Sequence, residues 1–167
     1  MKKVVCIVCL ALIALSSYSA QSMINPWIDC GKDIGCGAQK AGFNFPLKVK
    51  NYTVRAMKGM LELRFPLSDG RKVIIRKAQT HQGEADENGM IDISGDYNQY
   101  PVNRTIMLDN GVKFSVRGEE DSYKVVNFAA ETGYYSIMCN DGLNKTDIEY
   151  FYDLLAEAEA PKYGEEL

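Results

Sequence analysis

Apolar and polar residues alternate between residues 112 and 117, which predicts a strand with one buried and one exposed face. Residues 104–108 precede it, and the intervening Asn110-Gly111 is typical of a hairpin turn because both residues accept positive φ angles. Residues 123–130 are apolar on both faces, and residues 134–139 are rich in β-formers. We therefore expect a second hairpin with a central strand.

The hydrophobic period becomes that of a helix after residue 143. Asn144 can cap this helix, with Asp147 three residues later in a weakened capping box. We expect the helix to pack across the apolar face of strand 112–117. Its apolar stripe consists of Ile148, Phe151, Tyr152, Leu155 and Ala158.

Shorter patterns fill the first half of the chain. Residues 52–57, 61–67 and 73–77 predict three strands, and Asp33 can cap a short helix over residues 34–41 that ends at Gly42. The prediction is an α+β fold. It has an antiparallel meander sheet of about seven strands, a short N-terminal helix, and one C-terminal helix packed on one face.

The first 19 residues have the features of a secretory signal peptide. Lys2 and Lys3 precede an apolar run that is too short to span a membrane, and Ser17 and Ser19 suit cleavage after residue 19. We expect an exported protein, periplasmic or secreted. Its mature chain would be a single domain over residues 20–167, with a frayed acidic tail from about residue 159 and no transmembrane segment.

Charge narrows the class of partner. Loss of Lys2 and Lys3 with the signal peptide takes the formal net charge from −3 to −5. An acidic chain is a poor non-specific binder of nucleic acid, so we expect no nucleic-acid partner.

Cysteine usage fits the export prediction. Cys6 and Cys9 lie in the signal peptide, so Cys30, Cys36 and Cys139 remain. In an oxidising compartment we expect a Cys30–Cys36 disulfide, which closes a short loop and stabilises by about 2 kcal/mol. Cys139 is then either a buried thiol at a strand end or a rival partner for one of the other two.

Signatures of catalysis are weak. The single histidine, His81, lies in a polar loop, and no spacing indicates a Cys–His nucleophile, a zinc site or a phosphate-binding loop. We therefore expect no catalytic residues and no cofactor, with a hydrolase that uses an unrecognised pair of carboxylates left as an alternative.

A long polar segment, residues 79–102, interrupts the strands. Its side-chain oxygens are spaced like the start of a calcium loop, but Gly95 stands where the bidentate Glu is expected, and no helices flank the segment. An acidic turn is the preferred interpretation, and residues 91–97 predict a short edge strand or a docking segment. The weak calcium candidates are Glu84, Asp86, Asn88 and Asp92.

Several short motifs are spread along the chain: Asn25-Pro26-Trp27, Ala41-Gly42-Phe43, Ile75-Arg76-Lys77, residues 93–97 and residues 133–137. Together they resemble uncharacterised exported bacterial domains of unknown function associated with the envelope. The resemblance implies the fold and the location, and it carries no catalytic residues.

Strand alternation also predicts a basic sheet face. On an acidic chain such a face would be a local positive patch for an anionic envelope polymer, a lipid headgroup or an acidic partner protein. Ordinary pairing with acidic side chains is the competing interpretation. The residues are Arg55, Arg64, Arg76, Lys113 and Arg117.

A second binding hypothesis is a carrier of a lipid or other hydrophobic ligand between the sheet and the helix. Methionine side chains adapt well to such ligands, although they are equally ordinary core residues. The candidate lining is Met57, Met60, Met107 and Met138.

Overall fold

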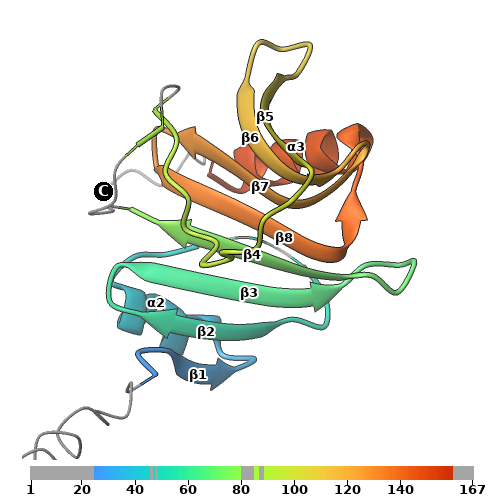
Figure 1. Cartoon of the computed structure of the whole chain (residues 1–167). Helices are drawn as coiled ribbons and strands as arrows, with labels where there is room; N and C mark the ends of the chain where they lie inside the picture. The colour runs from blue at the N-terminus through green and yellow to red at the C-terminus, as the bar shows by residue number, and fades with distance from the viewer. Residues whose placement is uncertain (1–24, 46, 48, 80–84, 87–88, 160–167) are drawn as a thin grey trace, which may run out of the picture.

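The computed structural model describes residues 25–45, 47, 49–79, 85–86 and 89–159. The predicted signal peptide, His81 and the tail beyond residue 159 lie outside the described residues. Within them, eight strands form one antiparallel sheet, accompanied by two helices (Figure 1). The predicted α+β fold class is confirmed.

The strands lie in the order β1-β2-β3-β4-β8-β7-β6-β5. Helix α2 precedes β2 in the chain, and helix α3 follows β8. The bounds are β1 Ile28–Gly31, α2 Ile34–Ala41, β2 Thr53–Met57, β3 Met60–Pro66, β4 Lys72–Ala78, β5 Val102–Met107, β6 Lys113–Glu119, β7 Ser122–Ala130, β8 Gly133–Leu143 and α3 Lys145–Glu159.

The strand count and the connectivity differ from the prediction. The additional strand is β1, which pairs with β2 at one edge of the sheet. Strands β1–β4 and β5–β8 are two meanders, and β4 lies beside β8 rather than β5. This pairing sets Ile75 directly opposite Ile137, and both are fully buried. Strands β4 and β8 thus occupy the middle of the sheet.

Helix α2 begins and ends, and helix α3 begins, where the capping residues predict. The Asp33 carboxylate accepts a hydrogen bond from the Cys36 N–H at the start of α2, and Gly42 ends that helix with a φ of 86°. Before α3, the Asp147 N–H donates to Asn144 Oδ1 over 2.9 Å, and the Asn144 N–H donates to Asp147 Oδ2 over 3.0 Å. The weakened capping box is therefore confirmed.

The main core lies between the sheet and the two helices. The Tyr152 ring of α3 lies 5.8 Å from the Phe114 ring, so the helix packs where the stripe predicts. Helix α2 approaches the sheet at Gly37, where an added Cβ would collide with the Val54 side chain. One row of core residues crosses six strands in register: Val54, Leu63, Ile75, Ile137, Val126 and Val116.

The opposite face of the sheet is partly covered. Residues 89–100 run over this face without strand pairing. In Figure 1 they form the loop that passes in front of β4 and β8. Ile91 and Ile93 are buried in a small cluster with Ala78, packed against Met60 and Tyr134. The segment supplies its own apolar contacts, so this face is less open to water than strand alternation alone predicts.

Candidate functional site

Four predicted arginines share the sheet face opposite the helices, which we call the arginine face. Arg55, Glu62 and Arg76 are paired in register across β2, β3 and β4, and Arg64 lies two residues beyond Glu62. Arg117 lies on β6, on the same face. The alternation of side chains along each strand places these groups on one face, and the register between the strands brings Arg55, Glu62 and Arg76 together.

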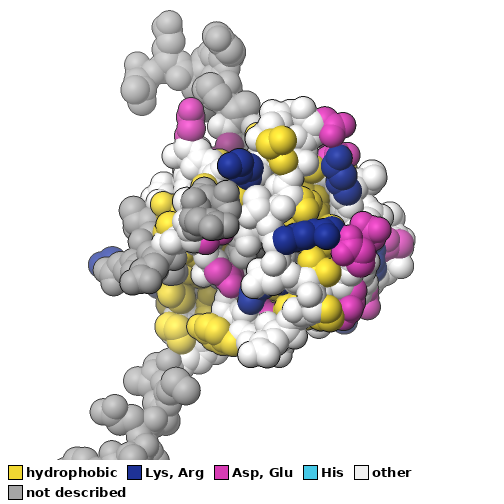
Figure 2. All heavy atoms as spheres, turned by 45° about the horizontal axis from the view of Figure 1, so that its top comes forward, with side chains coloured by type: hydrophobic (Ala, Val, Ile, Leu, Met, Phe, Trp, Pro, Cys, Tyr) yellow, Lys and Arg dark blue, Asp and Glu magenta, His cyan; other side chains and the backbone are white. Residues whose placement is uncertain are grey.

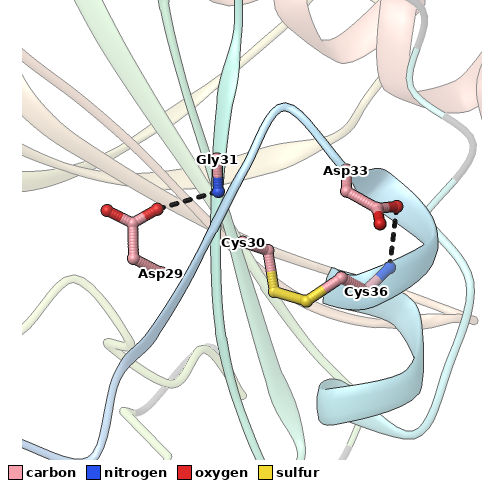
Figure 3. Close-up of a disulfide and its surroundings, with 5 residues drawn as sticks. All are labelled: Asp29, Cys30, Gly31, Asp33 and Cys36. Atoms are coloured by element: carbon pink, nitrogen blue, oxygen red, sulfur yellow. Dashed lines mark hydrogen bonds between the residues drawn. A yellow bond between two sulfur atoms is a disulfide. The ribbon is translucent and has the colours of Figure 1, made fainter.

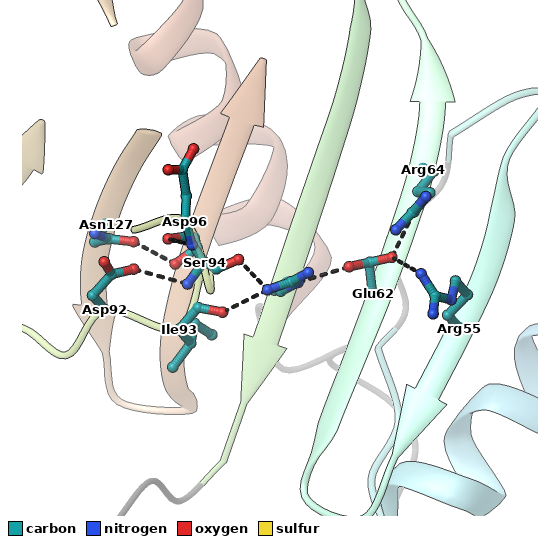
Figure 4. A network of polar contacts seen from close by, with 10 residues as sticks. Arg55, Glu62, Arg64, Asp92, Ile93, Ser94, Asp96 and Asn127 are labelled. Atoms are coloured by element: carbon teal, nitrogen blue, oxygen red, sulfur yellow. Dashed lines mark hydrogen bonds and ion pairs between the residues drawn. The ribbon is translucent and has the colours of Figure 1, made fainter. Parts of the chain in front are cut away.

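Glu62 is the centre of the network in Figure 4. Its carboxylate is fully buried, and it accepts hydrogen bonds from Arg64 Nε at 2.6 Å and Arg76 Nε at 2.7 Å. Arg55 Nη1 lies 3.8 Å from the same carboxylate. Three guanidinium groups thus surround one carboxylate, and the cluster retains two positive charges.

Trp27 covers part of this cluster. Its ring lies 5.5 Å from the Arg55 guanidinium carbon and 5.0 Å from that of Arg76. Cation–π attraction favours this arrangement. Trp27 therefore packs at the sheet edge and closes the network on the side of β1, which leaves Arg64 as the most exposed guanidinium, with 41% of its side chain accessible.

The remaining arginines hold residues 92–94 against the sheet. Arg76 Nη1 donates to the carbonyl oxygens of Ile93, at 3.2 Å, and Ser94. Arg117 Nη2 donates to Asp92 Oδ2 at 2.7 Å and to Ser94 Oγ at 3.1 Å. Arg76 and Arg117 are therefore occupied by internal contacts. Lys113, at the start of β6, is exposed and separate from the cluster around Glu62.

A groove of about 630 Å³ adjoins the cluster. Arg64 and Lys72 project from the arginine face and line this groove. Ile74 is paired with Arg64 across β3 and β4, and Met138 is paired with Ile74 across β4 and β8. Lys124 Nζ donates to the Asn140 carbonyl at the rim. The residues that line the groove include Arg64, Lys72, Ile74, Met138, Asn140 and Asp141.

Charge is mixed on the face of the molecule that Figure 2 shows, where separate Lys and Arg side chains lie next to acidic and apolar ones rather than in one continuous basic patch. The excess of positive charge around Glu62 comes from the three arginines that surround it. The charged residues that line the groove are one acid, Asp141, and two cations, Arg64 and Lys72.

The calcium candidates are only partly described. Glu84 and Asn88 lie outside the described residues. Asp86 Oδ1 accepts the Met90 N–H, while Asp92 accepts the Ser94 N–H and pairs with Arg117. Within the described ranges, no group of three or more His, Cys, Asp or Glu side chains is arranged to hold a metal ion.

The cysteines separate as expected. Cys30 and Cys36 form a disulfide that joins β1 to the first turn of α2, beside the Asp33 cap (Figure 3). Disulfides of this kind persist in oxidising compartments. Cys139 is a buried free thiol, and burial raises its pKa. Its thiolate is thus disfavoured, which makes it a poor nucleophile.

The carrier methionines do not gather between sheet and helix. Met57, Met60 and Met138 alternate with core residues and so lie on the arginine face, and Met107 is 62% exposed on β5. A cavity of about 440 Å³ does lie between the sheet and α3, and its walls are largely aromatic and aliphatic.

Lys77 is the residue that sequence reasoning missed. It is 2% exposed and lies on the helix-covered face. The signal was present in the alternation of Val73, Ile75 and Lys77, which places all three on one side of β4. A lysine in this position has to find a partner inside the core.

Comparison with protein-family models, with curated proteins and with solved structures finds no match to this chain. The resemblance to exported bacterial domains therefore stays a prediction. Among the described residues, no helix has the length and apolar character needed to cross a membrane.

Proposed function

We propose that this protein is exported and acts as a non-enzymatic binding module for an anionic component of the cell envelope, at the groove beside Arg64. The observation that carries the proposal is the surplus of positive charge around Glu62. Three guanidinium groups share one buried carboxylate, and Arg64 and Lys72 reach the groove.

Arg64 is well suited to hold an anion. Its Nε is fixed by Glu62 over 2.6 Å, so the side chain does not have to be ordered again on binding. A guanidinium has five N–H donors, and the Nη groups can pair with two oxygens of a carboxylate or phosphate. Ile74 and Met138 provide an apolar floor beside this cation, which suits a ligand with both charged and apolar parts.

Export is supported by the signal-peptide pattern together with the disulfide. Cys30 and Cys36 would be kept reduced in an ordinary cytosol. An envelope location places the groove near phosphate-rich and carboxylate-rich polymers and lipid headgroups, which share the chemistry that Arg64 recognises.

Binding tests this proposal directly. The mature chain is titrated with lipopolysaccharide and with phosphatidylglycerol vesicles, and phosphatidylcholine vesicles serve as the uncharged reference. Arg64→Gln removes a charged hydrogen bond worth about 1.5–3 kcal/mol, so binding to the preferred anionic probe should weaken about tenfold or more. Lys72→Gln should weaken it further.

The matched control is Arg104→Gln. Arg104 is an exposed arginine on β5 that pairs with Glu120, so the variant removes the same charge away from the groove. Equal weakening by Arg64→Gln and Arg104→Gln would show non-specific attraction and contradict the groove. Arg117 is left intact because it secures Asp92 and Ser94.

A further inference from the structure

Lys77 is a buried cation on the core side of the sheet. Its Nζ donates to Glu159 Oε1 at 2.6 Å, and Glu159 comes from the last described turn of α3. The Lys77 side chain is 2% exposed, and that of Glu159 is 18% exposed. Three aromatic rings lie 5.5 to 5.6 Å from the Nζ: Phe43, Phe45 and Tyr135.

Glu159 also lines the cavity of about 440 Å³ between α3 and the sheet. This volume is within the range of small-molecule sites, which runs from about 300 to 1,000 Å³. The Tyr135 hydroxyl lies 2.8 Å from Thr132 Oγ1. Burial raises the pKa of Tyr135, so the hydroxyl stays protonated and able to donate a hydrogen bond. The lining side chains that matter are Phe128, Thr132, Tyr135, Tyr152, Leu155 and Glu159.

The cavity thus combines an apolar wall with a cation directly behind one carboxylate. Glu159 is the last described residue of α3 and the ion-pair partner of Lys77. Displacement of its carboxylate would leave the Lys77 ammonium without this partner beside the cavity that Glu159 lines. A buried ammonium without a partner strongly favours an incoming anion.

We propose that this cavity binds a carboxylate with one apolar chain, whose head group replaces the Glu159 carboxylate on Lys77. The chain lies along the wall formed by Phe128, Tyr152 and Leu155. The site is separate from the groove beside Arg64, because it lies on the opposite face of the sheet. It also differs from the methionine-lined carrier in that recognition depends on one charge.

Calorimetric titration of the mature chain with dodecanoate tests the proposal, and dodecanol is the neutral probe with the same chain. Dodecanoate should bind and dodecanol should bind much more weakly. Lys77→Met should abolish the preference for dodecanoate. Glu159→Gln should raise the affinity for dodecanoate about tenfold, because the Glu159 carboxylate no longer competes for Lys77. This factor assumes that Lys77 is free of Glu159 in about a tenth of the wild-type molecules.

Glu157→Gln is the control, since this exposed side chain is on the same helix. It should leave the affinity unchanged, as should Arg64→Gln, which separates this site from the groove. Circular dichroism confirms that each variant is folded. Lys77→Met is expected to fold because an apolar chain of similar size replaces the buried charge. If Glu159→Gln is unfolded, the wild-type and Lys77→Met titrations decide.

Three results would each overturn the proposal. One is equal binding of dodecanoate and dodecanol by the wild-type protein. Another is undiminished dodecanoate binding by folded Lys77→Met. The third is no gain in affinity in folded Glu159→Gln.

Discussion

Replacement of Glu62 by glutamine tests whether this carboxylate organises the arginine face. Glu62 Oε1 accepts from Arg64 Nε and Glu62 Oε2 accepts from Arg76 Nε. A glutamine amide has one oxygen and one NH₂ group. In Glu62→Gln, one arginine N–H would therefore face a donor, and the negative charge that serves three guanidinium groups would be lost.

The loss should be about 3 kcal/mol of unfolding free energy. Removal of one partner from a buried ion pair costs about 3–5 kcal/mol. The lower end applies because the side chains of Arg64 and Arg55 are 41% and 24% exposed and can turn to water. Arg76 is only 15% exposed, and it carries most of the penalty. A domain with a total stability of about 5–15 kcal/mol would still fold.

Urea unfolding with linear extrapolation measures this loss, and an unchanged slope shows that the unfolding reaction is the same. Glu119→Gln is the control, because Glu119 is an exposed carboxylate at the end of β6 and should change stability by no more than about 0.5 kcal/mol. If Glu62→Gln is as mild as Glu119→Gln, the carboxylate does not hold the cluster together, and the reasoning on the arginine face is wrong.

Further predictions concern the core, the acid limb of stability and one turn. Phe151 is fully buried, so Phe151→Ala should lower the unfolding free energy by about 3–5 kcal/mol, whereas thermal unfolding of Tyr150→Ala, whose side chain is 58% exposed, should change little. Hydrogen bonds from Arg71 lower the pKa of Asp147. The ionised Asp147 therefore contributes to the unfolding free energy above about pH 4, and this contribution is lost as pH falls through the lowered pKa. Asp147→Asn should flatten that acid limb in urea titrations, and an unaltered limb would contradict the assignment. Gly133 has a φ of 139°, and an added Cβ would collide with the Ala78 carbonyl oxygen; Gly133→Ala should therefore lower Tm more than Gly111→Ala, where the added Cβ meets open space.

Local sequence patterns determined most of the elements. The alternation over residues 112–117 was sufficient to predict β6, and capping residues marked the ends of α2 and the start of α3. The spacing of the cysteines, together with the expectation of export, was sufficient to predict the Cys30–Cys36 pair. These features depend on neighbours along the chain, so the sequence itself contains the physical cause.

The candidate sites depended on residues that are distant in the chain. Strand alternation put Arg55, Arg64 and Arg76 on one face, but nothing local showed that Glu62 would be buried among them. Nor did a local signal show that residues 92–94 would occupy Arg76 and Arg117. Such contacts form only once the strands are in register.

The sequence by itself therefore determined seven of the eight strands that the structure describes and both helices in their order, three of the helix ends, and the apolar side of the alternating strands. Only the tertiary structure decided that β4 lies beside β8 and that Lys77 meets Glu159, which is 82 residues away in the chain. The physical reason is that the pairing of distant strands depends on how all their apolar faces pack together. No short stretch of sequence contains the information on how all these faces pack.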